Sequence, residues 1–411
     1  MSGGTRSYEM ARRLVAKGHQ VVLITTNRDR EQKERWEVSE EEGIIVHWLN
    51  LPYSNKMAFY KRLSAFIKFA IFSSLKAISL KGDVVFATST PLTVGIPGVV
   101  ASWFNRIPLV FEIRDLWPTV PIAIGALRSR FSIWLAKKLE KLIYVRSKRV
   151  VAVAPGMRDH VIEVMKGQRP VDIIPNGCDF SLFGNPKNTA ESTDIWTAVD
   201  PKRRLRGVYI GTVGNVNGVH AIVDLARAAL DAYGKDAFCF LIVGDGVKLT
   251  EVKTKARKVG VFNQNLYFHP AVVKSVVPRI LAFADFSLIT YSGAEVIYRD
   301  SVCNKFFDSL AAGKPVVSNF YGYSSKLSKR YAFGYIFNDN DSQGEVKKIK
   351  NLFENPSDLQ AMGAKAKAFG KKYFSRDDLA NLLEESLSKA AGKIDDDCEV
   401  GQHFDQLLQE R

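Results

Sequence analysis

One segment in the last third of the chain combines residue types that could hold a phosphorylated ligand. In Asp300–Asp308 a short loop opens a predicted helix whose first turn carries Lys305. The positive end of the helix dipole and the Lys305 ammonium would both attract phosphate oxygens. Asp308 lies about one turn further on, where its carboxylate could accept hydrogen bonds from a ribose diol. The alternative is an ordinary surface helix in which Lys305 and Asp308 form an i, i+3 pair.

A glycine-rich turn provides a second candidate for anion binding. The predicted strand 208–210 runs into a turn that contains Gly211, Gly214, Asn215 and Gly218, and a helix follows. A turn in this context can bring backbone N–H groups near a diphosphate. Glycines also permit close packing of a helix on a strand, so both interpretations stay open at this point.

Strands and helices alternate along most of the chain and must position these residues. Predicted strands at 84–87, 109–112 and 150–153 are separated by helices, and the same alternation resumes from 208. It predicts an α/β fold with parallel sheets, in which ligands bind beyond the carboxyl ends of the strands. Glu112, Arg114 and Asp115 fall at such an end.

The same alternation predicts two Rossmann-like domains. We expect an N-terminal domain over 1–178, an irregular linker over 179–206, a second domain over 207–375, and a C-terminal helix with an acidic tail over 376–411. The N-terminal domain begins unusually, because Ser2-Gly3-Gly4-Thr5 leads directly into the predicted helix 6–17. A strand normally precedes such a turn. We therefore expect that the first strand of this domain is missing through truncation, which would leave a sheet edge uncovered.

Positive charge is concentrated in the first part of the chain. The 411 residues carry a formal charge of +15, and 51–150 holds 16 basic but only 4 acidic side chains. Such an excess favours an anionic partner. A charged loop is expected over 27–42, and a helix with crowded apolar and basic residues over 56–80. That helix is either a core helix with a solvated basic face or an interfacial helix on anionic lipid.

Several classes of protein and site are disfavoured by the sequence. The four cysteines, Cys178, Cys239, Cys303 and Cys398, are far apart, which excludes a zinc ribbon and argues for reduced thiols. The longest uncharged stretch, 84–105, is interrupted by prolines and glycines and does not predict a membrane span. The histidines show no ligand spacing, so no metal is expected. No nucleic-acid recognition motif accompanies the basic residues.

Taken in order, the motifs resemble those of family 4 glycosyltransferases of the GT-B fold. Asp300 and Asp308 have the spacing of that family's paired acidic residues, and Ala312-Gly313-Lys314-Pro315 follows them. The opening Gly3-Gly4, the segment 174–180, the turn 209–218, Gly244-Asp245-Gly246 and Ala284-Asp285 match the same pattern. Within the family, Glu112–Pro118 and Ser301–Lys305 are most similar to bacterial O-antigen and capsule enzymes of the N-acetyl-fucosaminyltransferase type.

The resemblance implies transfer from a nucleotide-diphosphate sugar, a UDP-linked N-acetylated deoxyhexosamine, to a lipid-diphosphate-linked saccharide. Donor binding would fall to Asp308 at the ribose, to Lys305 and the Gly211–Asn215 turn at the diphosphate, and to Asp300 at the sugar hydroxyls. Glu112, Arg114 and Asp115 would face the reacting centre. The reaction would retain anomeric configuration and need neither a metal nor a cofactor, and the enzyme would be cytoplasmic and peripheral on the inner face of the cell membrane.

The chain also departs from the family pattern. Both acidic positions are Asp where Glu is commoner, and Arg114 stands where many relatives carry His. The basic pair that many members place in the glycine turn is absent from 211–218, so Lys305 with Arg279 must neutralise more of the diphosphate. Two alternatives remain at this point: a nucleotide-sugar epimerase of the same fold, and a basic polyanion-binding α/β protein.

Overall fold

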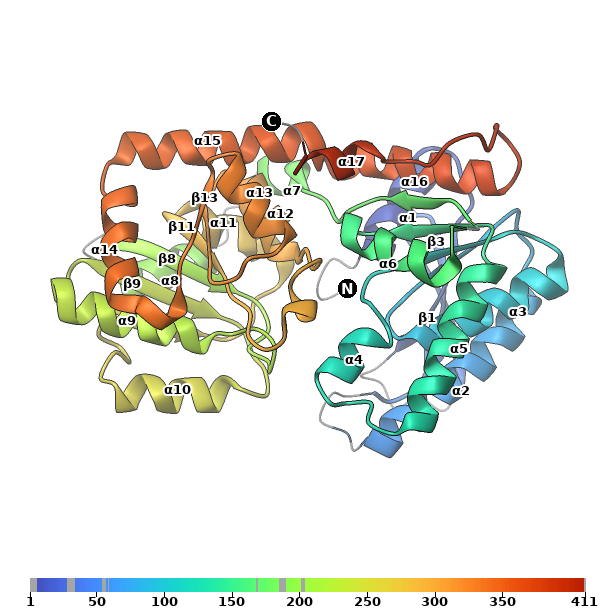
Figure 1. The fold of residues 1–411 in the computed structure, drawn as a ribbon, viewed down its shortest axis with the longest axis horizontal. Coiled ribbons are helices and arrows are strands. Elements are labelled where there is room, and N and C mark those ends of the chain that lie inside the picture. The colour runs from blue at the N-terminus through green and yellow to red at the C-terminus, as the bar shows by residue number, and fades with distance from the viewer. Residues whose placement is uncertain are drawn as a thin grey trace. The chain divides into compact units, whose positions relative to one another are not determined.

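The computed structural model describes residues 6–27, 34–53, 57, 59–167, 169–184, 190–200 and 204–409 (Figure 1). Contacts group the chain into two compact units. The first unit holds Thr5–Pro175 together with Asp377–Gln406, and the second unit holds Asn176–Arg376 together with the residues from Leu407 onward. Each unit is built mainly of parallel strands joined by helices, so the predicted α/β fold is confirmed.

The first unit contains two sheets. Their orders are β1-β3-β2 and β4-β5-β6-β7, and every pairing is parallel except that of β2 with β3. No strand precedes α1 among the described residues, and Ser2–Thr5 lie outside them. The strands are β1 (Val22–Asn27), β2 (Trp36–Glu41), β3 (Ile44–Asn50), β4 (Val85–Thr88), β5 (Leu109–Ile113), β6 (Arg149–Ala152) and β7 (Val171–Ile173).

The prediction of a charged loop over 27–42 is wrong for its second half. Strand β2 occupies Trp36–Glu41 and pairs antiparallel with β3. Glu42 and Gly43, both with positive φ, form the two-residue turn between the strands, a geometry that matches the twist of a hairpin. The segment 28–33 lies outside the described residues. Charged residues at alternate positions can form the solvated face of an edge strand, so a charged segment is compatible with a strand here.

Two helices of the first unit agree closely with the ranges predicted from the sequence, 6–17 and 56–80. The helix expected over 56–80 is α2 (Phe59–Ile78), and Lys56 lies outside the described residues. A short 3-10 turn, η1 (Leu92–Val94), precedes α3. The other helices are α1 (Arg6–Ala16), α3 (Gly95–Asn105), α4 (Thr119–Ala123), α5 (Arg130–Arg146), α6 (Pro155–Met165), α16 (Arg376–Ala390) and α17 (His403–Gln406).

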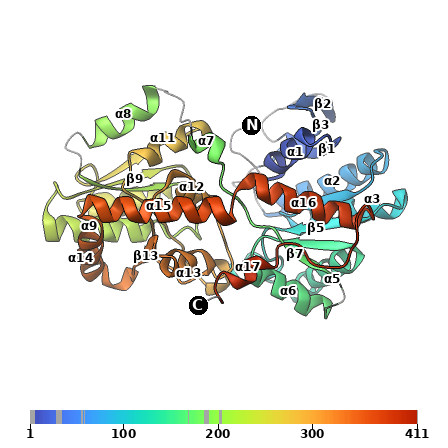
Figure 2. The same ribbon diagram turned by 90° about the horizontal axis from the view of Figure 1, so that it is seen from above.

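The C-terminal segment is an integral part of the first unit. Helix α16 lies beside α1, where Arg13 binds Asp377 and Lys17 binds Glu384 (Figure 2). Further along, the Ile173 N–H of β7 donates to the Val400 carbonyl. Asp396 and Asp405, two of the acidic residues expected in a tail, pair with Arg149 and Arg158 of the first unit.

This return of the chain changes how the charge is distributed. The first unit as folded carries 29 basic and 24 acidic side chains, and the second unit carries 29 and 19. The excess expected for the N-terminal domain as a whole is therefore reduced to the local excess over 51–150. The acidic return segment neutralises α1, β6 and α6 through Asp377, Asp396 and Asp405.

The second unit holds a six-stranded parallel sheet of order β10-β9-β8-β11-β12-β13. The strand order reverses between β8 and β11, and open α/β sheets bind ligands at such a switch point. Every residue of β9 is buried, as expected for a central strand. The strands are β8 (Leu205–Ile210), β9 (Phe238–Val243), β10 (Leu266–His269), β11 (Phe286–Ile289), β12 (Val316–Ser318) and β13 (Gly334–Ile336).

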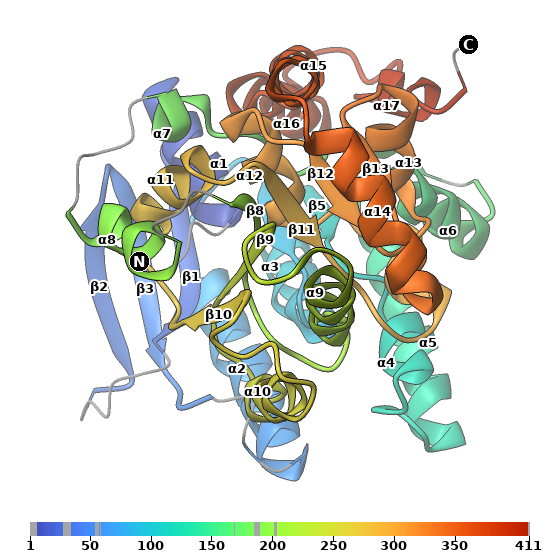
Figure 3. The ribbon, with the colours of Figure 1, turned by 90° about the vertical axis from the view of Figure 1, so that its left-hand side faces the viewer.

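Helices connect these strands, and α9 and α14 pack side by side on the sheet (Figure 3). The segment 179–206, expected to be irregular, contains α7, α8 and the start of β8; Trp196 of α8 is fully buried and donates to the Ile280 carbonyl. The helices are α7 (Phe180–Gly184), α8 (Ala190–Val199), α9 (His220–Tyr233), α10 (Leu249–Lys258), α11 (Val277–Ala282), α12 (Asn304–Ala312), α13 (Tyr323–Arg330), α14 (Ser342–Phe353) and α15 (Pro356–Tyr373).

Candidate active site

Lys305 lies at the carboxyl end of β8, directly beside the glycine-rich turn. A side-chain carbon built on Gly211 would come within 3.0 Å of the Lys305 Nζ, and Gly211 has the positive φ that glycine tolerates. The same Nζ lies 5.0 Å from the ring centroid of Tyr209. Burial alone would lower the pKa of Lys305, but Cys303, Tyr209 and Asp308 together raise it above its usual value. The switch point of the sheet therefore carries a charged ammonium group.

The glycines around this ammonium allow two loops to pack closely. A side-chain carbon on Gly244 would meet the Gly211 carbonyl oxygen at 1.9 Å, and one on Gly246 would meet that of Val213 at 2.2 Å. The Gly214 N–H donates to the Asn217 side chain at 3.0 Å, and the Asn215 carbonyl accepts from Ser292. Close packing thus explains why glycine is needed at 244 and 246. In the turn, the Gly214 N–H already donates a hydrogen bond within the protein.

The two acidic residues of the 300–308 segment each have a basic partner. Asp308, on α12, forms an ion pair with Lys274, which lies in a short 3-10 turn (Lys274–Val276) after β10. Asp300 is buried and accepts from Arg299 Nε at 2.9 Å. Arg279 lies half-buried on α11. Asp308 and Lys305 therefore share the start of α12, with Lys274 held against the carboxylate.

Tyr291 forms a wall of this site on the β11 side of the switch point. Its hydroxyl lies 3.1 Å from Ser301 Oγ, and its backbone N–H donates to the Asn319 side chain at 2.9 Å. Burial raises the pKa of Tyr291 well above its usual value, so the phenol stays neutral and can donate a hydrogen bond. Gly218 leaves room for the Tyr291 carbonyl, which joins the turn after β8 to the loop after β11.

In the first unit, Glu112 is engaged in a buried network. Its Oε1 accepts from Arg6 Nε at 2.7 Å, and its Oε2 accepts from the Thr88 hydroxyl at 2.7 Å. Arg6 also donates to the carbonyls of Ile174 and Pro175. Because both carboxylate oxygens are occupied and only 1% of Glu112 is exposed, the geometry favours a role in holding α1 to the strand ends.

Asp115 lies two residues beyond β5 and remains accessible to solvent. The Thr90 hydroxyl donates to its Oδ2 at 2.8 Å, and the Arg114 N–H donates to Ser89 Oγ at 3.0 Å. Desolvation of the carboxyl group raises the pKa of Asp115, against the lowering effects of Thr90 and Arg114. Of the three residues predicted here, Asp115 is therefore the carboxylate best placed to exchange a proton with a ligand.

The residues that the structure describes hold neither a cluster of metal ligands nor a membrane-spanning helix. No group of three or more His, Cys, Asp or Glu side chains in these residues is arranged to hold a metal ion. No helix among them is long and apolar enough to cross a bilayer.

Comparison with known families assigns both units. Residues 3–177 match the model described as "Glycosyl transferase 4-like domain", and residues 205–355 match the one described as "Glycosyl transferases group 1". Both units therefore match glycosyltransferase domain families, and their architecture is the α/β fold of GT-B glycosyltransferase structures. The predicted family is thereby confirmed at this level, and this glycosyltransferase can be compared with individual relatives.

Two curated relatives are similar in sequence. A putative teichuronic acid biosynthesis glycosyltransferase, TuaH of Bacillus subtilis, is 24% identical over 60% of this chain and 58% of its own length. A Bacillus cereus protein is 23% identical over 87% of this chain and 93% of its own. It is named UDP-N-acetylglucosamine--N-acetylmuramyl-(pentapeptide) pyrophosphoryl-undecaprenol N-acetylglucosamine transferase 2. The chain thus spans less than two thirds of TuaH and nearly all of the second relative.

Solved structures share the fold. Sucrose-phosphate synthase of Thermosynechococcus elongatus superposes with a TM-score of 0.74 at 14% identity, over 95% of this chain and 94% of that one. HepE of Anabaena, solved in complex with UDP-glucose, gives a TM-score of 0.66 at 15% identity, over 90% of this chain and 100% of that one. Similarity at this level of identity establishes the architecture of this glycosyltransferase.

Three residues beside the predicted ones were missed by sequence reasoning, two in the second unit and Arg6 in the first. Lys274 and Tyr291 lie on loops after β10 and β11, and no local motif marks them. Their positions at strand ends beside the switch point were the available signal. Arg6 was assigned to a helix without a partner, because its contacts to Glu112 and to 174–175 span more than a hundred residues.

Proposed function

We propose that this glycosyltransferase transfers a sugar from a nucleotide diphosphate, with UDP as the nucleotide, to a lipid-diphosphate-linked saccharide. The observation that carries the proposal is the charged Lys305 at the switch point of the second unit, between the turn after β8 and the start of α12. HepE, which shares the fold, is described in complex with UDP-glucose. A cationic site at a helix N-terminus suits a diphosphate.

The chemistry assigned to the second unit is stabilisation of a leaving nucleotide diphosphate. As the bond to the sugar breaks, negative charge develops on the diphosphate, where Lys305 and the N–H groups at the start of α12 would act. Asp308 would accept hydrogen bonds from the ribose, with Lys274 fixing its carboxylate, and Asp300 would bind sugar hydroxyls. Gly211, Gly214, Asn215 and Arg279 complete the proposed donor site, whose action requires no metal ion.

In the first unit, Asp115 would handle the proton of the acceptor hydroxyl while Arg114 offers charge beside it, and Glu112 would position the strand end. Retention of anomeric configuration is the proposed outcome. The sugar is proposed to be an N-acetylated deoxyhexosamine, as in the resemblance to N-acetyl-fucosaminyltransferases. The pyrophosphoryl-undecaprenol in the name of the Bacillus cereus relative and the teichuronic acid in that of TuaH support a lipid-linked acceptor and polysaccharide synthesis.

We place the reaction at the inner face of the cell membrane, in O-antigen, capsule or exopolysaccharide synthesis. The decisive experiment incubates the protein with a panel of nucleotide sugars and a lipid-diphosphate-linked saccharide, and follows the product by mass. A mass gain of one sugar residue on the acceptor supports the proposal. Interconversion of the nucleotide sugar without any transfer would identify an epimerase instead.

Donor binding can be tested through Asp308. UDP at a hundredfold excess over its dissociation constant should stabilise the protein by about 2.7 kcal/mol, and Asp308→Ala is expected to abolish the resulting rise in melting temperature. This variant also leaves Lys274 without its carboxylate partner. The UDP-induced rise in melting temperature is therefore also measured for the double variant Asp308→Ala with Lys274→Met. Asp231→Ala, which removes an exposed pair with Arg227 on α9, is the control. A normal UDP shift in Asp308→Ala would refute the assignment.

The role of Asp115 predicts a separate defect. Asp115→Asn keeps the size of the side chain and its contact with Thr90 but removes the titratable carboxylate. Transfer is expected to fall by about 10²–10⁴-fold, the usual contribution of a general acid or base, while the UDP-induced thermal shift stays unchanged. Asp159→Asn, at an exposed pair on α6, serves as the control. Full activity in Asp115→Asn would exclude this role.

A further inference from the structure

Helix α2 exposes a stripe of large apolar side chains, and its fully buried positions are small. Tyr60, Leu63, Ile67, Ile71 and Leu75 recur at helical spacing and are exposed, Leu75 to 63%. The buried positions of the helix hold small residues, namely Ala65, Ala70, Ser73 and Ser74, while Phe66, Phe69 and Phe72 are half-buried. A surface helix normally turns its bulky apolar stripe to the core. The stripe on α2 is therefore available to an apolar environment outside the first unit's core.

Helix α3, which packs against α2, has the same arrangement. Its buried face consists of Gly95, Pro97, Gly98 and Ala101. A side-chain carbon on Gly98 would lie 2.8 Å from Ala87 Cβ of β4, so the helix rests directly on the sheet. Trp103 and Phe104 at the end of the helix are exposed, Trp103 to 67%. Small residues thus fix α3 to the sheet while its large ones point away from the core.

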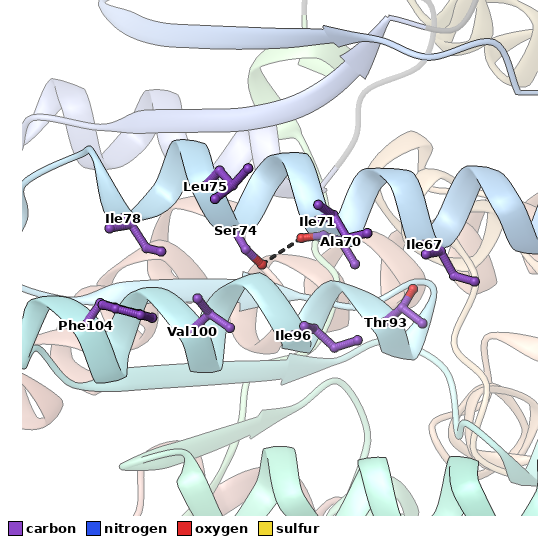
Figure 4. A pocket seen from close by; sticks show the side chains of 10 residues that line it. All are labelled: Ile67, Ala70, Ile71, Ser74, Leu75, Ile78, Thr93, Ile96, Val100 and Phe104. Atoms are coloured by element: carbon purple, nitrogen blue, oxygen red, sulfur yellow. Dashed lines mark hydrogen bonds between the residues drawn. The ribbon is translucent and has the colours of Figure 1, made fainter.

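An apolar groove of about 450 Å³ lies between the two helices (Figure 4). This volume falls within the range of small-molecule sites, roughly 300–1,000 Å³. Ser74, whose hydroxyl donates to the Ala70 carbonyl, and Thr93 are the polar side chains of its lining. The remaining lining is apolar: Ile67, Ala70, Ile71, Leu75, Ile78, Ile96, Val100 and Phe104. The groove therefore suits a hydrocarbon chain better than a polar ligand.

Helix α5 extends this surface. It contacts α3, and a side-chain carbon on Gly95 would lie 2.4 Å from Ile143 Cδ1. Phe131 and Trp134 stack at 6.0 Å and are both exposed on α5. Exposed Leu135 and Leu142 continue their stripe along the helix.

The charges on these helices define the partner. Neither α2 nor α3 contains an acidic residue, and Glu140 of α5 is buried, where Tyr144 and His160 bind it. Exposed lysines accompany the apolar stripes, namely Lys61 and Lys68 on α2 and Lys137, Lys138 and Lys141 on α5. Apolar stripes with exposed aromatics and lysines are suited to the boundary between anionic headgroups and acyl chains.

We propose that α2, α3 and α5 insert into an anionic phospholipid bilayer, with an acyl chain of a bilayer lipid in the groove between α2 and α3. The proposal deepens the proposed function, on which it rests for a lipid-linked acceptor. It adds two helices and a groove to the single basic helix that the sequence indicated. The apolar stripes would enter the acyl region of the bilayer, and the lysines would bind anionic headgroups.

The test uses the full-length protein and vesicles of phosphatidylcholine with and without phosphatidylglycerol. Wild-type protein should sediment with the anionic vesicles, and Ile71→Gln with Leu75→Gln should weaken binding about tenfold per side chain withdrawn from hydrocarbon. Lys61→Gln with Lys68→Gln should weaken it about fivefold per lysine, in anionic vesicles only. Val38→Gln, at an exposed apolar position on β2, and Lys365→Gln with Lys371→Gln on α15 are the matched controls.

The depth to which the helices insert into the bilayer and the occupancy of the groove by an acyl chain are measured separately. Phospholipid brominated in its acyl chains should quench tryptophan fluorescence, and Trp103→Phe with Trp134→Phe should remove most of the quenching. Val100→Phe should fill the groove and displace a fluorescent fatty acid at an unchanged melting temperature. Equal vesicle binding by the α2 variant and the controls would overturn the proposal. So would dimerisation in lipid-free buffer that the same variant abolishes, since a second copy would then cover the surface.

This test is independent of the catalytic proposal. Protein that binds vesicles as described but transfers no sugar would leave the docking surface standing and refute the proposed function. Conversely, α2 variants should keep the UDP-induced thermal shift and their activity on a water-soluble acceptor that carries the same saccharide diphosphate. If the α2 variants lose both the UDP-induced thermal shift and this activity, the substitutions have damaged the fold. The milder Ile71→Ala variant must then show the same defect in vesicle binding, and the proposal fails if it does not.

Discussion

Replacing Lys305 with Met is expected to lower kcat/KM for sugar transfer by about 10²–10³-fold, the loss seen when one preorganised donor to a developing oxyanion is removed. Methionine keeps most of the length of the side chain beside Gly211 and Tyr209 but lacks the charge. The defect should fall mainly on kcat, because negative charge on the diphosphate is greatest as the bond to the sugar breaks. Steady-state kinetics with the best nucleotide sugar provides the measurement.

Lys326 offers a closely matched control for this experiment. It also lies half-buried in the second unit, with its Nζ 5.0 Å from a tyrosine ring centroid, that of Tyr321, but it is on α13 rather than at the glycine-rich turn. Lys326→Met should therefore remove a similar cation–π contact and leave transfer unchanged. If the two variants behave alike, the ammonium of Lys305 has no special role, and the donor site must be sought elsewhere.

The sequence predicted the elements of the second unit better than the contacts between them. The segment 300–308 and the turn 211–218 each have a local signature, because a helix start and a tight turn depend on neighbouring residues. Their juxtaposition follows from the strand order, which puts β8 next to β11. The partner of Asp308 could not be found this way, since Lys274 lies 34 residues earlier on a different loop.

The functional interpretation of Glu112 shows where motif reasoning reaches its limit. A carboxylate at the carboxyl end of a parallel strand is in the right place for catalysis, and the sequence favoured that role. The structure engages both oxygens of this carboxylate, with Arg6 and Thr88. Asp115, three residues later, remains accessible. Only the packing of side chains distinguishes the Glu112 carboxylate from that of Asp115. The spacing of residues along the sequence carries no information on this packing.

The charge distribution depends on topology in the same way. Counted along the chain, the basic excess belongs to the N-terminal part, yet the acidic C-terminal segment folds back onto that part. Asp396 pairs with Arg149, and Asp405 pairs with Arg158. Within the first unit, what remains unneutralised is the local excess on α2 and α5, so the membrane hypothesis now applies to a smaller surface than the whole domain.

The C-terminal segment also leads to the largest expected effect on stability. Arg149 is fully buried and donates to both oxygens of Asp172 and to the Cys398 carbonyl. The same carboxylate accepts from the Ser386 hydroxyl at 2.6 Å and from the Val400 N–H at 2.7 Å. One buried carboxylate therefore joins β6 and β7 to the segment that returns from the second unit.

Arg149→Met is expected to destabilise the first unit by about 3–5 kcal/mol, because Asp172 would remain buried without its cation. The melting temperature should fall by roughly 10 °C, and limited proteolysis should cut the segment after α16 first, since it loses its anchor. The double variant Arg149→Met with Asp172→Asn should be more stable than Arg149→Met alone, because the uncompensated charge is gone. Arg227→Met, at an exposed pair on α9, should cost under about 1 kcal/mol. A double variant no more stable than the single one would show that packing, rather than the buried charge, ties the C-terminal segment to the sheet.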